Sequence, residues 1–247
     1  MDWTFRDQLF GCQWSLLATN YNFGHRKLSD EALVTNSRPT HFGRKKILAT
    51  KYGTFRDQND IFIAGTETTS STMEWAMAEI LHNPKTLFEA RVEFEKTIGK
   101  GKQVKESDIP QLPYLRAIVK ETFRKHRTVP LLVPRKVEVD VEVCGFNVPK
   151  GTQVLVNAWG IGRDRSTCES PNLFGQDFEL IPFGAGKRIC PGLPLAMRML
   201  HLMLGSLIYS FDWKLVDGIS PKEMNMEEKF GFTLKKAQPL RVAPVYL

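Results

Sequence analysis

Apolar residues recur every three or four positions in three successive stretches of the chain, a spacing typical of helices that bury one face. The first stretch covers residues 59–82 and stops at the pair Asn83-Pro84, because proline interrupts a helix that reaches it. The second covers about 84–98 and stops at a glycine, and the third covers about 112–125. The pattern therefore predicts three consecutive helices.

The pattern changes after residue 130. Residues 136–143 alternate valine with charged residues, and residues 152–156 are again β-prone, so both predict strands. A loop rich in glycine and proline covers 171–192, and a long apolar helix is expected from there to about Phe211. Strand-like pieces follow near Thr233 and at 240–242. We expect a mainly α fold with small β-sheets.

The first 57 residues differ from the rest because no hydrophobic period is sustained there. Asparagine, glycine and proline interrupt the run often, which predicts loop with short helices. This divides the chain into an N-terminal segment of uncertain fold, residues 1–57, and a patterned region, residues 58–247.

Composition narrows the class of protein. With 42% hydrophobic and 25% charged residues, the chain can bury an ordinary core. The net charge of +7 is spread without a long basic tract, so we do not expect nucleic-acid binding. The N-terminus lacks the apolar run of a signal peptide or anchor. The apolar stretch 193–213 contains Arg198 and His201, which favours a buried helix over a membrane span.

The strongest chemical signal lies around Cys190, in the run from Phe183 to Gly192. Pro191 suits the first position of a helix, which would place the thiol at the N-cap, near the positive end of the helix dipole. The preceding Lys187 and Arg188 add positive charge, and both effects favour the thiolate form that binds metals. The alternative is a buried structural cysteine in a glycine-rich loop.

Phe183, Gly186, Arg188, Cys190 and Gly192 match the signature FxxGxRxCxG, and the run resembles the cysteine loop of cytochrome P450 monooxygenases. The resemblance implies haem b, bound with Cys190 as the axial thiolate ligand, which favours cleavage of the O–O bond. It also implies that Arg188 holds a haem propionate, that Phe183 shields the sulfur and that Gly192 belongs to the cofactor-binding loop.

Sequences on both sides of this loop resemble the plant geraniol-hydroxylase-like subfamily. They are residues 178–182, residues 229–234 and the pair Pro239-Leu240. The resemblance covers about residues 59–247, the C-terminal half of such an enzyme. It implies a partial cytochrome P450 fold made of the oxygen helix, the ExxR helix, the cysteine loop and the helix that follows the loop.

The first predicted helix contains a run of poor helix formers, residues 64–72, in its interior. In the family this run forms the groove that holds dioxygen. By resemblance, Glu67 and Thr68 are the catalytic acid and alcohol that relay protons, and Ala64 and Gly65 leave room beside them. The alternative is a Ser/Thr-rich helix whose hydroxyls bond to its own carbonyls.

Glu121 and Arg124 are three residues apart on the third predicted helix and therefore share a face. They match the structural ExxR pair, which in the family has a third partner, an arginine of a PERF-like segment. No such segment follows here, and Arg163 or Arg165 is the candidate substitute. Loss of a partner from a buried pair is destabilising.

Two further features match positions around the substrate pocket of the family. Arg135 matches a second propionate-binding position, and residues 130–133 match a strand that lines the pocket.

Residues 1–57 offer no counterpart to the family's membrane anchor, its WxxxR propionate arginine or most of its substrate-contacting helices, so we expect a truncated chain. The first hypothesis is a haem-thiolate monooxygenase that hydroxylates a small lipophilic, terpenoid-type substrate with O₂. A flavoprotein reductase would supply electrons from NADPH. The second is a catalytically inactive remnant, either a weak haem binder or an unstable protein. The family implies the endoplasmic reticulum membrane, and a chain without an anchor would be peripheral or cytoplasmic.

Overall fold

The computed structural model describes residues 58–164, 178 and 180–246. The expectations for the segment 1–57 and for Arg165 lie outside these residues. Within them the fold is mainly helical with small sheets, as the hydrophobic pattern predicts.

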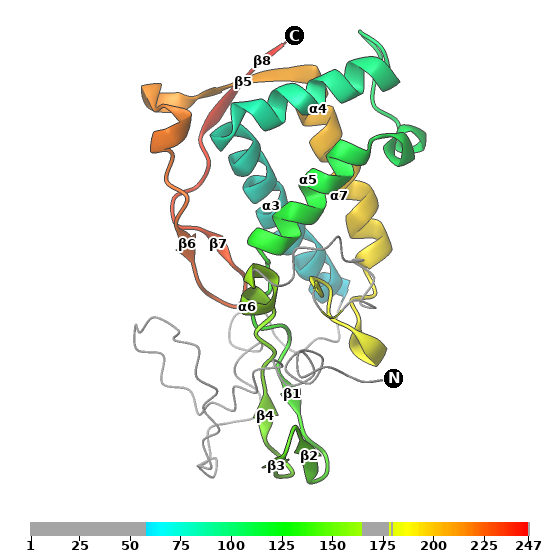
Figure 1. Ribbon diagram of the computed structural model, residues 1–247, viewed down its shortest axis with the longest axis vertical. Coiled ribbons are helices and arrows are strands. Elements are labelled where there is room, and N and C mark those ends of the chain that lie inside the picture. The colour runs from blue at the N-terminus through cyan, green and yellow to red at the C-terminus, as the bar shows by residue number, and fades with distance from the viewer. Residues whose placement is uncertain (1–57, 165–177, 179, 247) are drawn as a thin grey trace, which may run out of the picture.

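Four long helices form the body of the molecule (Figure 1). They are α3 (Gln58–His82), α4 (Pro84–Thr97), α5 (Pro113–Lys125) and α7 (Leu193–Ser210). Proline stands in the first turn of α4, α5 and α7, where the missing N–H has no helical partner to lose. All four expected helices are confirmed, with bounds within about two residues of the prediction.

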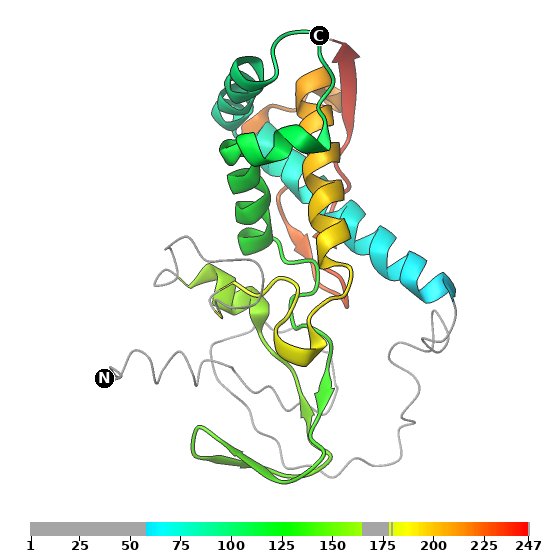
Figure 2. The same ribbon diagram turned by 90° about the vertical axis from the view of Figure 1, so that its right-hand side faces the viewer.

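Within the described ranges, the strands form four antiparallel pairs of two strands each. β1 (Arg135–Lys136) pairs with β4 (Gln153–Val154), and β2 (Val141–Val143) pairs with β3 (Phe146–Val148). β5 (Phe211–Leu215) pairs with β8 (Val242–Tyr246), and β6 (Glu228–Lys229) pairs with β7 (Lys235–Lys236). Figure 2 shows the β2–β3 hairpin projecting away from the helices.

The single strand expected at 136–143 is wrong, because the structure divides it into β1 and β2. The side chain of Asp140 accepts a hydrogen bond from the backbone N–H of Lys150, at 2.6 Å, where the chain bends between the two pairs. Cys144 and Gly145 then adopt positive φ angles of 53° and 79° and make the hairpin turn. Alternation of valine and charge gave no sign of this bend.

Shorter elements connect the main ones. They are η1 (Glu106–Gln111), α6 (Ala158–Arg163), η3 (Gly186–Arg188), η4 (Val216–Gly218) and η5 (Pro221–Glu223). The sequence did not predict α6, whose N-cap side chain, Asn157, accepts a bond from the Gly160 N–H.

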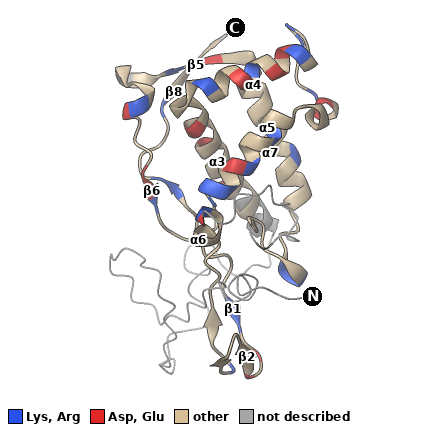
Figure 3. Ribbon diagram, viewed as in Figure 1, with Lys and Arg blue, Asp and Glu red and all other residues tan. Residues whose placement is uncertain are grey.

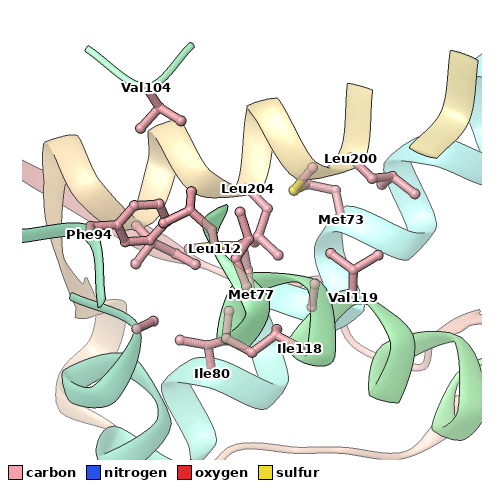
Figure 4. Packing of buried hydrophobic residues seen from close by; sticks show 14 of the residues in the cluster. Met73, Met77, Ile80, Phe94, Val104, Leu112, Ile118, Val119, Leu200 and Leu204 are labelled. Atoms are coloured by element: carbon pink, nitrogen blue, oxygen red, sulfur yellow. The ribbon is translucent and has the colours of Figure 1, made fainter. Parts of the chain in front are cut away.

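One apolar core joins the four long helices. Figure 4 shows side chains from α3, α4, α5 and α7 packed against one another, with Phe94 and Leu204 among them. Phe94 is fully buried and Leu204 nearly so, and full burial of one such side chain contributes about 1.5–3 kcal/mol. A second, smaller cluster consists of Leu132, Val156, Ala158, Ile181 and Ala185.

The helix α7 is long and apolar enough, by length and composition, to cross a membrane. Its buried residues nevertheless pack into the core with α3, α4 and α5, and they include Leu200, Leu204 and Ile208. The expectation of a buried helix is consistent with this packing.

The structure corrects the expected start of this helix. α7 begins at Leu193 with Gly192 at its N-cap, so Cys190 lies two residues before the N-cap and not on it. Pro191 belongs to a turn in which the Leu193 N–H donates to the Cys190 carbonyl at 3.3 Å. Pro194 is the proline that occupies the first turn of the helix.

Residues 130–133 form a turn and not the expected strand. Leu132 has a φ of 51°, a conformation that side-chain-bearing residues rarely adopt, and it is 9% exposed. Its side chain packs in the second apolar cluster, which compensates for the backbone conformation.

Candidate functional site

The cysteine loop is an ordered turn shaped by glycine. Gly184 and Gly186 have φ angles of 73° and 65°, which glycine adopts without strain. The N–H of Cys190 donates to the Phe183 carbonyl at 2.9 Å, and the N–H of Ile189 donates to Gly186 at 3.1 Å. These bonds bring the two ends of the loop together and fix the backbone of Cys190.

Phe183 attaches this loop to the helical core. Its ring meets the ring of Phe123 on α5 edge to face, with centroids 5.0 Å apart. Phe123 is buried, and it follows Glu121 on the same helix by two residues. The loop that holds the thiol therefore rests on the helix that carries the ExxR pair.

The thiol of Cys190 is exposed and free. A side chain at Gly192 would place its Cβ 3.7 Å from the sulfur, and glycine leaves that space open. Lys187 and Arg188 are exposed beside it. Within the described ranges no three His, Cys, Asp or Glu side chains gather into a metal site. This donor set of one accessible thiol fits a haem, because the macrocycle supplies the other ligands of the iron.

On α3, the hydroxyls of the expected oxygen groove bond to carbonyls of their own helix. Thr68 donates to the Ala64 carbonyl at 2.7 Å, and Thr72 donates to the Thr68 carbonyl at 2.9 Å. This is the geometry of the alternative interpretation, a Ser/Thr-rich helix. Ala64 and Gly65 are exposed, and a Cβ on Gly65 would meet no atom within 4 Å, so there is open space beside them.

Glu67 lies against the C-terminal segment, which the sequence did not predict. Lys235 on β7 forms an ion pair with its carboxylate at 2.5 Å, and the Thr233 hydroxyl donates to it at 3.2 Å. Glu67 and Lys235 also line an open polar pocket of about 390 Å³ along one face of α3, with Ser70, Ser71 and Glu74. A lysine in a short strand 168 positions away carries no sequence signal that would connect it with a glutamate on a helix.

The ExxR pair forms as expected. Arg124 donates from Nε and Nη2 to the two carboxylate oxygens of Glu121, at 2.7 and 2.6 Å. Its Nη1 donates to the Gly162 carbonyl on α6 at 2.9 Å, so the pair also holds α5 against α6. The side chain of Glu121 is about half exposed, and Arg163 pairs with Glu228. Arg163 therefore does not take the place of the missing third partner.

A buried charged cluster beside this pair was not foreseen. His126 lies between two carboxylates, with Nε2 2.8 Å from Glu79 on α3 and Nδ1 2.9 Å from Glu228 on β6. Its ring stacks on Trp75 with centroids 3.8 Å apart. Burial opposes ionisation of Glu79, but hydrogen bonds and charge from His126 and Lys125 prevail and lower its pKa to about 2. The cluster joins α3, α5 and β6.

Arg135 lies at the start of β1, half-buried, opposite Val154 of β4. The second apolar cluster brings this region to the cysteine loop, because it contains Leu132 from the turn before β1 and Ala185 from the loop. The two arginines expected to hold propionates, Arg135 and Arg188, thus come from segments that share one apolar cluster.

The described residues form a helical body, small antiparallel sheets and a glycine-framed cysteine loop ahead of the last long helix. The chain belongs to the cytochrome P450 family, because the family's sequence profile matches residues 56–241.

Its relatives include plant terpenoid hydroxylases. The chain is similar to geraniol 8-hydroxylase of Catharanthus roseus, with 59% identity over 198 residues, and to that of Swertia mussotii, with 58% over 195. It is 52% identical over 198 residues to drimenol monooxygenase of Persicaria hydropiper. These matches cover 74–75% of this chain and 39–40% of each relative.

Proposed function

We propose that this chain is the haem- and oxygen-binding portion of a monooxygenase that inserts one oxygen atom of O₂ into a small terpenoid alcohol. The observation that carries the proposal is the cysteine loop, in which hydrogen bonds to Phe183 and Gly186 hold an accessible thiol at a fixed position. Haem, bound through this thiol, would supply the activation of dioxygen. The names of the plant relatives support the substrate class.

Each loop residue has a role in holding the cofactor. Cys190 would be the axial ligand, and the exposed cations Lys187 and Arg188 favour its thiolate form. Arg188 and Arg135 would bind the two propionates, since a guanidinium matches a carboxylate in charge and shape. Phe183 would keep water from the sulfur, and Gly192 leaves space beside it.

On α3, Glu67 and Thr68 would move protons toward the reacting oxygen. The single hydrogen of the Thr68 hydroxyl is donated to the Ala64 carbonyl. To donate to the reacting oxygen, the hydroxyl would have to break this bond or form a bifurcated one. Glu67 reaches solvent through the polar pocket along α3, so protons can enter from that side. Ala64 and Gly65 would leave room for dioxygen and the substrate.

Electrons would come from NADPH through a flavoprotein reductase that docks on a basic face. By family, the complete protein would work at the endoplasmic reticulum membrane. The substrate and the site of hydroxylation belong to the whole enzyme, and this chain spans about 40% of the length of its relatives.

The test is a single-turnover assay on the chain produced with haem, in the presence of a plant flavoprotein reductase, NADPH and geraniol. We expect an alcohol that is one oxygen atom heavier than geraniol, detected by mass spectrometry. Cys190→Ala should abolish the product, and Thr68→Val should lower its yield while haem content is unchanged. Haem uptake with no oxygenated product from geraniol would contradict the proposal and favour an inactive haem binder.

A further inference from the structure

Arg127, two residues after the end of α5, has the most deeply buried charged side chain among the described residues. It is 1% exposed, and a Cβ on Gly162 of α6 would lie 2.8 Å from its Nη2. Its Nε reaches the Phe123 carbonyl over a long 3.4 Å contact. Neither Nη1 nor Nη2 has a hydrogen-bond partner in the described part of the chain.

The charged neighbours of Arg127 have the same sign. Burial and, to a smaller extent, the charges of Arg163 and Arg124 together lower its pKa to about 9, and no carboxylate of the described residues opposes them. Arg124 is neutralised by Glu121, and Arg163 shares Glu228 with His126. Arg124 and Arg163 each contact a carboxylate, whereas the terminal nitrogens of Arg127 contact none among the described residues.

Arg163 adds a third unsatisfied group to this junction. Its Nη2 donates to Glu228, but its Nη1 is buried without a partner among the described residues. Three guanidinium NH₂ groups, two on Arg127 and one on Arg163, therefore lack an acceptor among the described residues where α5 meets α6. Figure 3 shows basic residues gathered at the C-terminal end of α5, above α6.

A buried cation without a counter-charge is costly, and orphaned buried donors mark places where an ion or water is bound. Water would accept hydrogen bonds but would not balance the excess positive charge. We propose that a small monovalent anion of the chloride type binds between Arg127 and Arg163, beside Gly162. This site does not depend on the proposed enzymatic function.

The burial of the donors argues for a small ion. Each of the three NH₂ nitrogens exposes less than 1 Å² to solvent, so a bulky phosphate ester has no open path to them. The position also gives the anion a structural effect. It would neutralise repulsion next to the bond from Arg124 to the Gly162 carbonyl, and so stabilise the contact between α5 and α6.

The test is thermal unfolding of the full chain in potassium chloride, with potassium gluconate replacing it at constant ionic strength. Gluconate is too large for the site. We expect the melting temperature to rise with the logarithm of the chloride concentration above the dissociation constant, by about 5–10 °C at a hundredfold excess. No chloride-specific rise would overturn the proposal.

Two variants and one direct measurement make the result specific. Arg127→Met should lose the chloride effect, whereas Arg116→Met, a change at an exposed arginine of α5, should keep it. A rise that survives in Arg127→Met would place the anion elsewhere and contradict the site. In crystals of the unmodified chain grown with bromide, the anomalous signal should lie between Arg127 and Arg163; a signal only at other positions would overturn the assignment.

Discussion

At the scale of single residues, two glycines differ in how much space surrounds them. Gly162 has no room for a side chain, because its Cβ would lie 2.8 Å from both the Arg124 carbonyl and Arg127 Nη2. Gly65 on α3 is the opposite case, with nothing within 4 Å of its Cβ. The first glycine is required by packing, and the second leaves open a space that the proposed function uses.

Gly162→Ala should therefore lower the free energy of unfolding by about 2 kcal/mol, since the backbone of α5 must shift. Gly65→Ala should raise it by up to about 1 kcal/mol, because alanine favours a helix interior. Urea unfolding of both variants measures the pair of effects. Equal effects of the two substitutions would contradict the packing at Gly162. In the haem-loaded chain, Gly65→Ala should also lower product yield, by filling the oxygen groove.

The sequence predicted local chemistry better than it predicted partners. The Glu121–Arg124 pair depends on neighbours in the sequence and forms as expected, whereas the expected N-cap position of Cys190 was wrong. The sequence could not predict that Glu67 pairs with Lys235 or that His126 contacts Glu228, because each partner lies in a short strand more than 100 positions away. Side chains brought together by tertiary packing leave no periodic pattern in the sequence.

At the scale of elements, helices were predicted well because each buries a stripe with a regular period. The short strands and α6 were not predicted well. Strands of two or three residues are too short to show a period, and the turns between them determine where they begin and end. The split between β1 and β2 depends on the Asp140 side chain and on positive φ at Cys144, neither of which alternation of valine and charge reports.

The charged cluster that joins α3, α5 and β6 makes stability depend on pH. The pKa of Glu79 in the fold, about 2, lies below its usual 4.5, so its stabilising effect is complete above that value and is lost as the pH falls toward 2. We expect the free energy of unfolding to fall by about 3 kcal/mol over this window on account of Glu79. Denaturant unfolding at a series of pH values measures this fall.

The matched comparison uses a second glutamate. Glu79→Gln should flatten the pH dependence between about pH 5 and pH 2 and lower the stability at neutral pH. Glu89→Gln, a change at an exposed position on α4, should leave the curve as it is. A curve for Glu79→Gln that is as steep as that of the unmodified chain would contradict the role of the cluster.

At the scale of the whole molecule, the core is carried by the four long helices. Phe94→Ala should lower the free energy of unfolding by about 3–5 kcal/mol, because the ring is fully buried between α4, α5 and α7. Met203→Ala, at a 43% exposed position on α7, should change it by less than about 1 kcal/mol. Chemical denaturation of both variants distinguishes a shared core from helices that are only loosely associated.

Whether Cys190 ligates haem in this chain can be read from one absorption spectrum. The chain is produced with haem supply, reduced and exposed to carbon monoxide, and its Soret absorption is recorded. We expect the strongly red-shifted band of thiolate-ligated haem, and its loss in Cys190→Ala. An unshifted band, no haem uptake, or a red-shifted band that persists in Cys190→Ala would contradict ligation by Cys190.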